Sequence, residues 1–270
     1  MTVELSQPAV CAAYMSNVPK EILVCQRAVF RHLSIPLNQV LIDGRSHGKW
    51  LSDHVNLAAS SSDDTIIVIA DIDAFPLSLS AYKHAIQSAG RGRVFGLAQV
   101  ANHCRPKDLY AGPCFLAFSI ATYIKLGAPD LDEGPRNDVA QRLTDAAIES
   151  GIEVELKYPT VSIVPKWPLA ERGVFGIGTF YGDLEFFHLF QSRLQLGVDL
   201  FRIVADDVSN GRPLDFQQYL HIAAPLNCTA GNFSAGPPPS HWMSLARGAS
   251  GFKFIQSSIG RVFTRMWGRK

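Results

Sequence analysis

Short apolar runs alternate with amphipathic stretches over the first hundred residues. The pattern predicts three strands and two helices, in the order Val10–Tyr14 (strand), Lys20–Leu33 (helix), Gln39–Asp43 (strand), His47–Ala59 (helix) and Thr65–Asp71 (strand). This is the spacing of βα units, so we expect an α/β fold with a doubly wound central sheet. Ligands bind such sheets beyond the carboxyl ends of the strands, which would bring Asp43 and Asp71 to one rim.

The pattern continues less regularly toward residue 231. It predicts a helix, two strands and a short helix at Leu79–Ala89, Arg93–Gln99, Cys114–Ser119 and Ala121–Leu126. A further helix is expected to start at Asn137 as its N-cap, with Asp138 in the first turn. Three glycines between 173 and 179 predict a flexible loop, and the aromatic residues at 180–190 are interpreted as a rim.

Composition divides the chain into a body and a tail. The Pro-rich and Ser-rich residues 232–240 have the composition of a linker, so we expect a folded domain at 1–231 and a tail at 241–270. The last 30 residues hold six of the 25 basic residues and none of the 24 acidic ones, so an acidic body carries a basic tail. Tail residues such as Phe254, Ile259 and Trp267 lie between these charges, a composition that suits an interfacial helix as well as one packed on the body.

Other features of the composition bear on the compartment. Hydrophobic residues make up 47% of the chain, which excludes a disordered protein, while the longest apolar runs are too short to cross a bilayer. The start resembles no signal peptide. Five scattered cysteines suggest neither a disulfide framework nor a zinc site. We therefore expect a cytoplasmic protein, with peripheral contact to the inner face of a membrane through the tail.

The sharpest motif is a pair of carboxylates at the end of a buried strand. Asp71 and Asp73 follow the apolar run 66–70 with one residue between them. Carboxylate oxygens at the open end of a strand are suitable ligands for Mg²⁺ or Mn²⁺, and such a cation can hold a diphosphate. The alternative is that both residues only cap the loop before Pro76.

A second acidic segment follows at 126–154. It holds an Asp-rich loop at 130–133, Asp138 at the expected helix start, Arg142-Leu143 one turn later and Gly151 before a returning strand. With the Asp71-Ile72-Asp73 motif, this order resembles that of glycosyltransferases with the GT-A fold, a Rossmann-type fold, over residues 10–194. The acceptor side matches loosely, since Asn137-Asp138 stands where the family has Glu-Asp.

The resemblance implies a hexosyltransferase that moves a sugar from a nucleotide-diphosphate donor, with a UDP-sugar favoured. Asp71 and Asp73 would handle the metal and the donor diphosphate. Asp138 would be the general base of an inverting enzyme, although Asp132 and Glu133 are alternatives and a retaining route stays open. Asp138 also reads as a surface acid that complements a helix dipole.

Three weaker candidates complete the expected site. His188 lies among aromatic residues and resembles the late histidine that completes the metal shell in several GT-A enzymes, although a structural histidine fits the pattern too. Arg193 is expected to neutralise a donor phosphate. Asp43 would face the base and ribose of the donor, or simply form an Asp-Gly turn.

The basic tail suggests a lipid-linked or saccharide acceptor, in the synthesis of a surface polysaccharide or glycolipid. Nucleic acid is not expected as a partner, because the body is acidic. Two alternatives remain. One is a phosphohydrolase of the haloacid dehalogenase type, with Asp71 as nucleophile and Asp206-Asp207 as its metal motif. The other is a scaffold that binds sugar nucleotides without catalysis.

Overall fold

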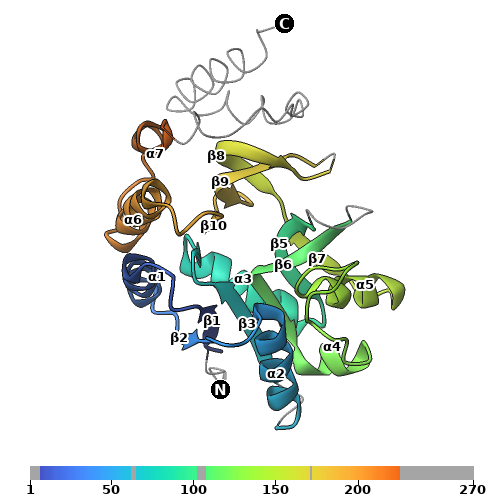
Figure 1. Ribbon diagram of the computed structural model, residues 1–270. Coiled ribbons are helices and arrows are strands. Elements are labelled where there is room, and N and C mark those ends of the chain that lie inside the picture. Colours follow the sequence, from blue (N-terminus) through green and yellow to red (C-terminus); the bar gives the residue numbers. More distant parts are fainter. Residues whose placement is uncertain (1–6, 62–64, 102–107, 171, 226–270) are drawn as a thin grey trace, which may run out of the picture.

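The structure is a computed structural model that describes residues 7–61, 65–101, 108–170 and 172–225 (Figure 1). These residues form a mixed α/β fold with one six-stranded sheet, one four-stranded sheet and seven helices. The expected linker at 232–240 and the tail at 241–270 lie outside the described residues. None of the helices in the described part of the chain is long and apolar enough to cross a membrane.

The larger sheet is mixed. Its strands follow the spatial order β2 (Leu37–Leu41), β1 (Val10–Tyr14), β3 (Ile66–Asp71), β6 (Leu109–Ser119), β5 (Val94–Val100) and β7 (Val154–Lys157). β1 pairs in parallel with β2 and β3, whereas β6 runs antiparallel to both β3 and β5. The chain leaves β1 for β2 on one side and returns to β3 on the other. The boundary between β1 and β3 is therefore a topological switch point, where open α/β sheets bind ligands.

Helices cover both faces of this sheet (Figure 1). Successive side chains of a strand point to opposite faces, so Val68 and Ala70 enter one core while Ile67 and Ile69 enter the other. The first core is closed by α1 (Lys20–His32), α3 (Leu79–Gly90), α6 (Gln195–Ser209) and α7 (Phe216–Ala223). The second is closed by α2 (His47–Ala59), α4 (Ile120–Lys125) and α5 (Gln141–Glu149).

The periodicity of the first hundred residues predicts these elements well. The bounds of β1 and α2 are confirmed, and those of α1, β3, α3 and β5 agree to within a residue or two. β2 ends at Leu41, two residues before the predicted end. Asp43 therefore lies in the turn after the strand and not in it.

The four-stranded sheet was not predicted. Its order is β4 (Ala74–Pro76), β10 (Phe186–Leu189), β9 (Val174–Tyr181) and β8 (Pro159–Pro168), with antiparallel pairing throughout. The expected flexible loop at 173–179 is wrong, because most of it is β9. Gly176 serves close packing here: a Cβ at this position would lie 2.5 Å from the carbonyl oxygen of Ile163.

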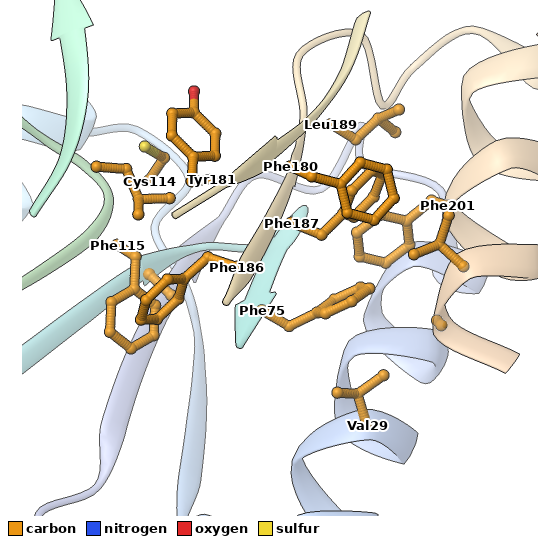
Figure 2. Packing of buried hydrophobic residues seen from close by; sticks show 14 of the residues in the cluster. Val29, Phe75, Cys114, Phe115, Phe180, Tyr181, Phe186, Phe187, Leu189 and Phe201 are labelled. Atoms are coloured by element: carbon orange, nitrogen blue, oxygen red, sulfur yellow. The ribbon is translucent and has the colours of Figure 1, made fainter. Parts of the chain in front are cut away.

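The expected aromatic rim at 180–190 is also wrong. Phe180, Phe186 and Phe187 are fully buried. Figure 2 shows Phe187 beside Phe75 and Phe201, between β4, β10 and α6, and the ring centroids of Phe75 and Phe187 are 5.4 Å apart. These rings join the small sheet to the α1 side of the fold. They hold β10, which carries His188, in a fixed place.

The helix expected to start at Asn137 begins later. α5 starts at Gln141, and its N-cap is Ala140, which has a φ of 62° and offers no side-chain cap. Asn137 instead donates its amide to the backbone oxygen of Asp132, 2.9 Å away, which shapes the preceding loop. Asp138 is thus a loop residue held before the helix, and the helix-dipole interpretation of its carboxylate does not apply.

Candidate metal centre and cleft

The turn from β3 to β4 carries Asp71 and Asp73. The fully buried Gln26 of α1 fixes this turn, because its amide nitrogen lies 2.8 Å from the backbone oxygen of Asp71 and 2.9 Å from that of Ala74. β10 pairs with β4 so that His188 lies opposite Ala74, and Leu189 donates its N–H to the backbone oxygen of Asp73. The pairing of β10 with β4 thus brings an imidazole to two carboxylates more than a hundred residues away in sequence.

These three side chains form a compact group. His188 Nε2 lies 3.5 Å from Asp71 Oδ2 and 3.5 Å from Asp73 Oδ1, and one potential ligand atom from each residue lies within 4.8 Å of the others. The His188 side chain is 5% exposed, against 23% for Asp71 and 15% for Asp73, so the carboxylates face the open side. Two carboxylate oxygens and one imidazole nitrogen suit Mn²⁺ or Mg²⁺, with Mn²⁺ favoured by the imidazole.

Electrostatic interactions in this group favour a proton on His188, which lies between two carboxylates. Burial lowers the pKa of His188, but Cys114 and Asp73 outweigh it, and the net pKa lies well above the ordinary value. Burial raises the pKa of Asp71, and the coulombic effects of His47 and His188 lower it. An imidazolium at His188 would offset one of the two carboxylate charges when no cation is bound. A divalent cation would replace that proton, since a ligating histidine must be neutral.

Some buried polar atoms around the group have no hydrogen-bond partner within the described residues. They are His188 Nδ1, His47 Nε2 and Tyr181 Oη. Figure 2 places Tyr181 beside Cys114, whose thiol interacts with His188. His47 Nδ1 lies 3.7 Å from Asp71 Oδ1. Buried polar groups are normally paired, so these three atoms leave hydrogen-bonding capacity for water or a ligand.

The group lies in a cleft of about 610 Å³ at the β1/β3 switch point. On the β1 side, Met15, Val18 and Ile42 give an apolar wall, together with the ring of Tyr14. Arg193 lines this end too, and its Nε donates to Asn17 Oδ1, 3.3 Å away in the loop that follows β1. This half of the cleft offers apolar contact and one guanidinium group, that of Arg193.

The opposite half, beyond β3, is polar. Tyr110 Oη lies 2.9 Å from Asp138 Oδ2 and 3.1 Å from Gln99 Oε1, and all three residues line the cleft. Asp138 Oδ1 accepts the N–H of Val139, 2.9 Å away. Burial, with a further contribution from Asp138, raises the pKa of Tyr110 well above its ordinary value, so the hydroxyl keeps its proton and donates it.

The structure brings most of the residues expected from the sequence together. Asp71, Asp73 and His188 form the group, and Asp138 and Arg193 line the same cleft. Asp43 does not line it. Asp43 is exposed and accepts the N–H of Ser16, 2.8 Å away, so it holds the turn after β1.

The two alternative bases also lie outside the described lining of the cleft. Asp132 Oδ1 accepts the hydroxyl of Ser46, 3.0 Å away, and the backbone N–H of Glu133. Their loop packs against the start of α2, where a Cβ on Gly48 would lie 2.5 Å from Asp132 Oδ1. Of the three acids weighed from the sequence, Asp138 has the access to the cleft that a base needs.

Sequence reasoning missed His47 and Gln99 as site residues. His47 follows β2 at the start of α2, and the rule that strand ends share a rim could have found it. Gln99 lies near the end of β5 and would have needed the antiparallel pairing with β6, which sets it opposite Tyr110. Nothing in local spacing indicates that pairing.

Comparison with known proteins gives no assignment: no family model matches the chain, and no curated protein matches it. Function is therefore argued from the residues of the cleft and from the place of the cleft in the fold.

Proposed function

We propose that this chain is a metal-dependent glycosyltransferase with a GT-A-like fold, which transfers a hexose from a nucleotide-diphosphate donor to a saccharide or lipid-linked acceptor. One observation carries the proposal: a single cleft has an apolar wall, a metal-binding group and a hydrogen-bonding wall in that order across the sheet. A nucleotide sugar has the matching order of a flat base, an anionic diphosphate and a polyhydroxylated ring.

The topology supports the same ligand. The cleft lies at the carboxyl ends of β1 and β3, where the strand order reverses, and open α/β sheets bind nucleotides at such points. The Asp71–Asp73 turn follows β3 directly, so a cation held there would lie at the middle of the crevice. On this proposal the nucleoside lies over β1 and β2, against Met15 and Ile42.

The donor set fits a divalent cation. Asp73 and His188 would hold it with Asp71, because His188 Nε2 already faces both carboxylates at 3.5 Å. When bound, Mn²⁺ or Mg²⁺ supplies charge stabilisation for the leaving diphosphate. Arg193, on the β1 side of the cleft, would add a positive charge near the junction of the nucleoside and the diphosphate.

Asp138 is the residue proposed to move a proton. The acceptor hydroxyl oxygen forms a bond to the anomeric carbon, the bond from that carbon to the diphosphate oxygen breaks, and the hydroxyl proton passes to the carboxylate of Asp138. Tyr110 and the backbone of Val139 hold this carboxylate from two sides, which fixes its direction in the cleft. A base held in this way acts at a defined face of the sugar, as an inverting reaction requires.

The acceptor is proposed from the sequence of the tail. Apolar and basic residues alternate there without acids, a composition that favours an anionic membrane surface and thus a lipid-linked acceptor in surface polysaccharide or glycolipid synthesis.

The test is a thermal shift experiment with UDP-, GDP- and dTDP-sugars, with Mn²⁺ or with EDTA, on the wild type and on Asp73→Ala. A ligand that binds only the native state raises the melting temperature. We expect stabilisation by one nucleotide class, present with Mn²⁺ and lost both in EDTA and in the variant. No shift with any nucleotide would contradict the proposal.

A further inference from the structure

The polar half of the cleft has an excess of hydrogen-bond acceptors. Tyr110 has one hydroxyl proton, and two acceptors face it, Asp138 Oδ2 at 2.9 Å and Gln99 Oε1 at 3.1 Å. The Gln99 amide can be turned so that Nε2 faces Tyr110, so the acceptor capacity that remains for a ligand is that of Asp138. Its two carboxylate oxygens accept one hydrogen bond each, from Tyr110 and from the N–H of Val139, and keep further lone pairs, so this wall suits a molecule that brings hydroxyl groups.

The charge of this half is negative. Asp138 is its charged residue, and the one arginine or lysine among the described residues of the cleft lining, Arg193, lies at the other end, bonded to Asn17. A ligand carboxylate placed against the polar wall would face the carboxylate of Asp138, whereas the basic side chains of the lining contact other residues: His47 and His188 contact Asp71 and Asp73, and Arg193 contacts Asn17. Like charges in contact are unfavourable, and proteins use such repulsion to reject ligands.

We infer that the sugar transferred by this protein is neutral and carries free hydroxyl groups, and that Gln99, Tyr110 and Asp138 select it over an acidic sugar. The inference rests on the proposed function, because it takes the cation site to hold the diphosphate. With the diphosphate fixed there and the nucleoside over β1, the sugar is the part of the donor that reaches the polar wall. Gln99 and Tyr110 bind its hydroxyls, and the charge of Asp138 excludes a uronic acid.

The experiment uses two matched donor pairs, UDP-glucose with UDP-glucuronate and GDP-mannose with GDP-mannuronate. The members of each pair differ only in a CH₂OH or a carboxylate at C6. Calorimetric titration with Mn²⁺ measures the affinity of the full-length protein for each donor and for UDP and GDP alone. For the pair that binds, we expect the protein to bind the neutral donor at least about tenfold more tightly than the acidic one.

Two variants separate charge from fold. Asp138→Asn keeps the shape of the side chain and removes its charge, so we expect the preference for the neutral donor to shrink several-fold. Asp53→Asn is the matched control, because Asp53 is a partly exposed acid on α2 outside the described lining, and it should keep the wild-type preference. Gln99→Met should lower the affinity for the neutral donor and leave the affinity for UDP or GDP alone unchanged.

The outcomes are distinct. Equal affinity for neutral and acidic donors, or a preference that survives Asp138→Asn in full, overturns this inference while the proposed function stands. Absence of Mn²⁺-dependent binding of every nucleotide overturns the proposed function and the inference with it.

Discussion

Two acidic pairs in this chain resemble each other in sequence and differ in the structure. Asp71 and Asp73 line the cleft beside His188, and the nearest imidazole contact is 3.5 Å long. Asp206 and Asp207 lie in the last turns of α6. There, Asp207 Oδ1 accepts Arg212 Nε at 3.0 Å and Asp207 Oδ2 accepts the Tyr219 hydroxyl at 2.6 Å. The carboxylates of the first pair can still bind a ligand, whereas those of the second pair already accept hydrogen bonds from side chains of the protein.

The second pair has a structural role. Asp207 and Tyr219 join α6 to α7, and the Asp207 side chain is 6% exposed, so this pair stabilises the junction between two helices. The phosphohydrolase alternative needs Asp206 and Asp207 as metal ligands near Asp71. Neither residue belongs to the described lining of the cleft, which leaves that alternative without support from the structure.

The largest expected effect separates the pairs by metal affinity. Asp73→Asn removes a carboxylate ligand, and we expect Mn²⁺ affinity to fall by at least about a hundredfold, because loss of a partner that only supports a ligand already costs ten- to a hundredfold. Asp206→Asn should leave the affinity unchanged. Titration calorimetry with Mn²⁺ measures both, and equal losses in the two variants would erase the distinction.

The next effect separates the pairs by stability. Asp207→Asn removes the charged acceptor of the buried Tyr219 hydroxyl, and we expect about 2 kcal/mol of lost unfolding free energy. Asp73→Asn relieves the repulsion between two adjacent carboxylates and weakens the contact with His188, so we expect a smaller loss than for Asp207→Asn in the metal-free protein. Urea unfolding in EDTA gives both values. A larger loss for Asp73→Asn than for Asp207→Asn would reverse the roles assigned here.

The smallest effect concerns pH at the second pair. Burial, and then the hydrogen bond to Asp207, raise the pKa of Tyr219 above its ordinary value of 10.0. The folded protein keeps this proton where the unfolded chain releases it, so this contribution to stability is complete below pH 10 and is lost as the pH rises further. The Tyr219→Phe variant should be less stable than the wild type at neutral pH, but its free energy of unfolding should fall less than that of the wild type between pH 9 and 11. Parallel pH curves for the two proteins would show that the hydrogen bond has no such role.

Much of the first half of the fold could be predicted, because periodicity is local. The buried run 66–70 and the amphipathic positions of α2 report their own environment. Asp71 and Asp73 were found for the same reason, since two carboxylates after an apolar strand have no role in packing. His188 could be named from its residue type, but only the pairing of β10 with β4 places it beside Asp71 and Asp73.

The second half could not be predicted from local pattern. Gly176 was interpreted as flexible, whereas its missing Cβ lets β9 approach the backbone of β8. Phe186 and Phe187 face two different aromatic clusters, with Phe115 on one side and Phe75 on the other, so both faces of β10 are buried and no alternation appears. Asn137 is a good N-cap by type, which predicts a helix around Asp138, but the loop uses that amide elsewhere.

The most direct test of the central claim is a crystal structure with Mn²⁺ and the nucleoside diphosphate that gives the largest thermal shift, with anomalous data that locate manganese. We predict a peak between Asp71, Asp73 and His188, with the diphosphate oxygens against it and the base over Met15 and Ile42. A peak at Asp206 and Asp207, or none at the β3 end, would contradict the account.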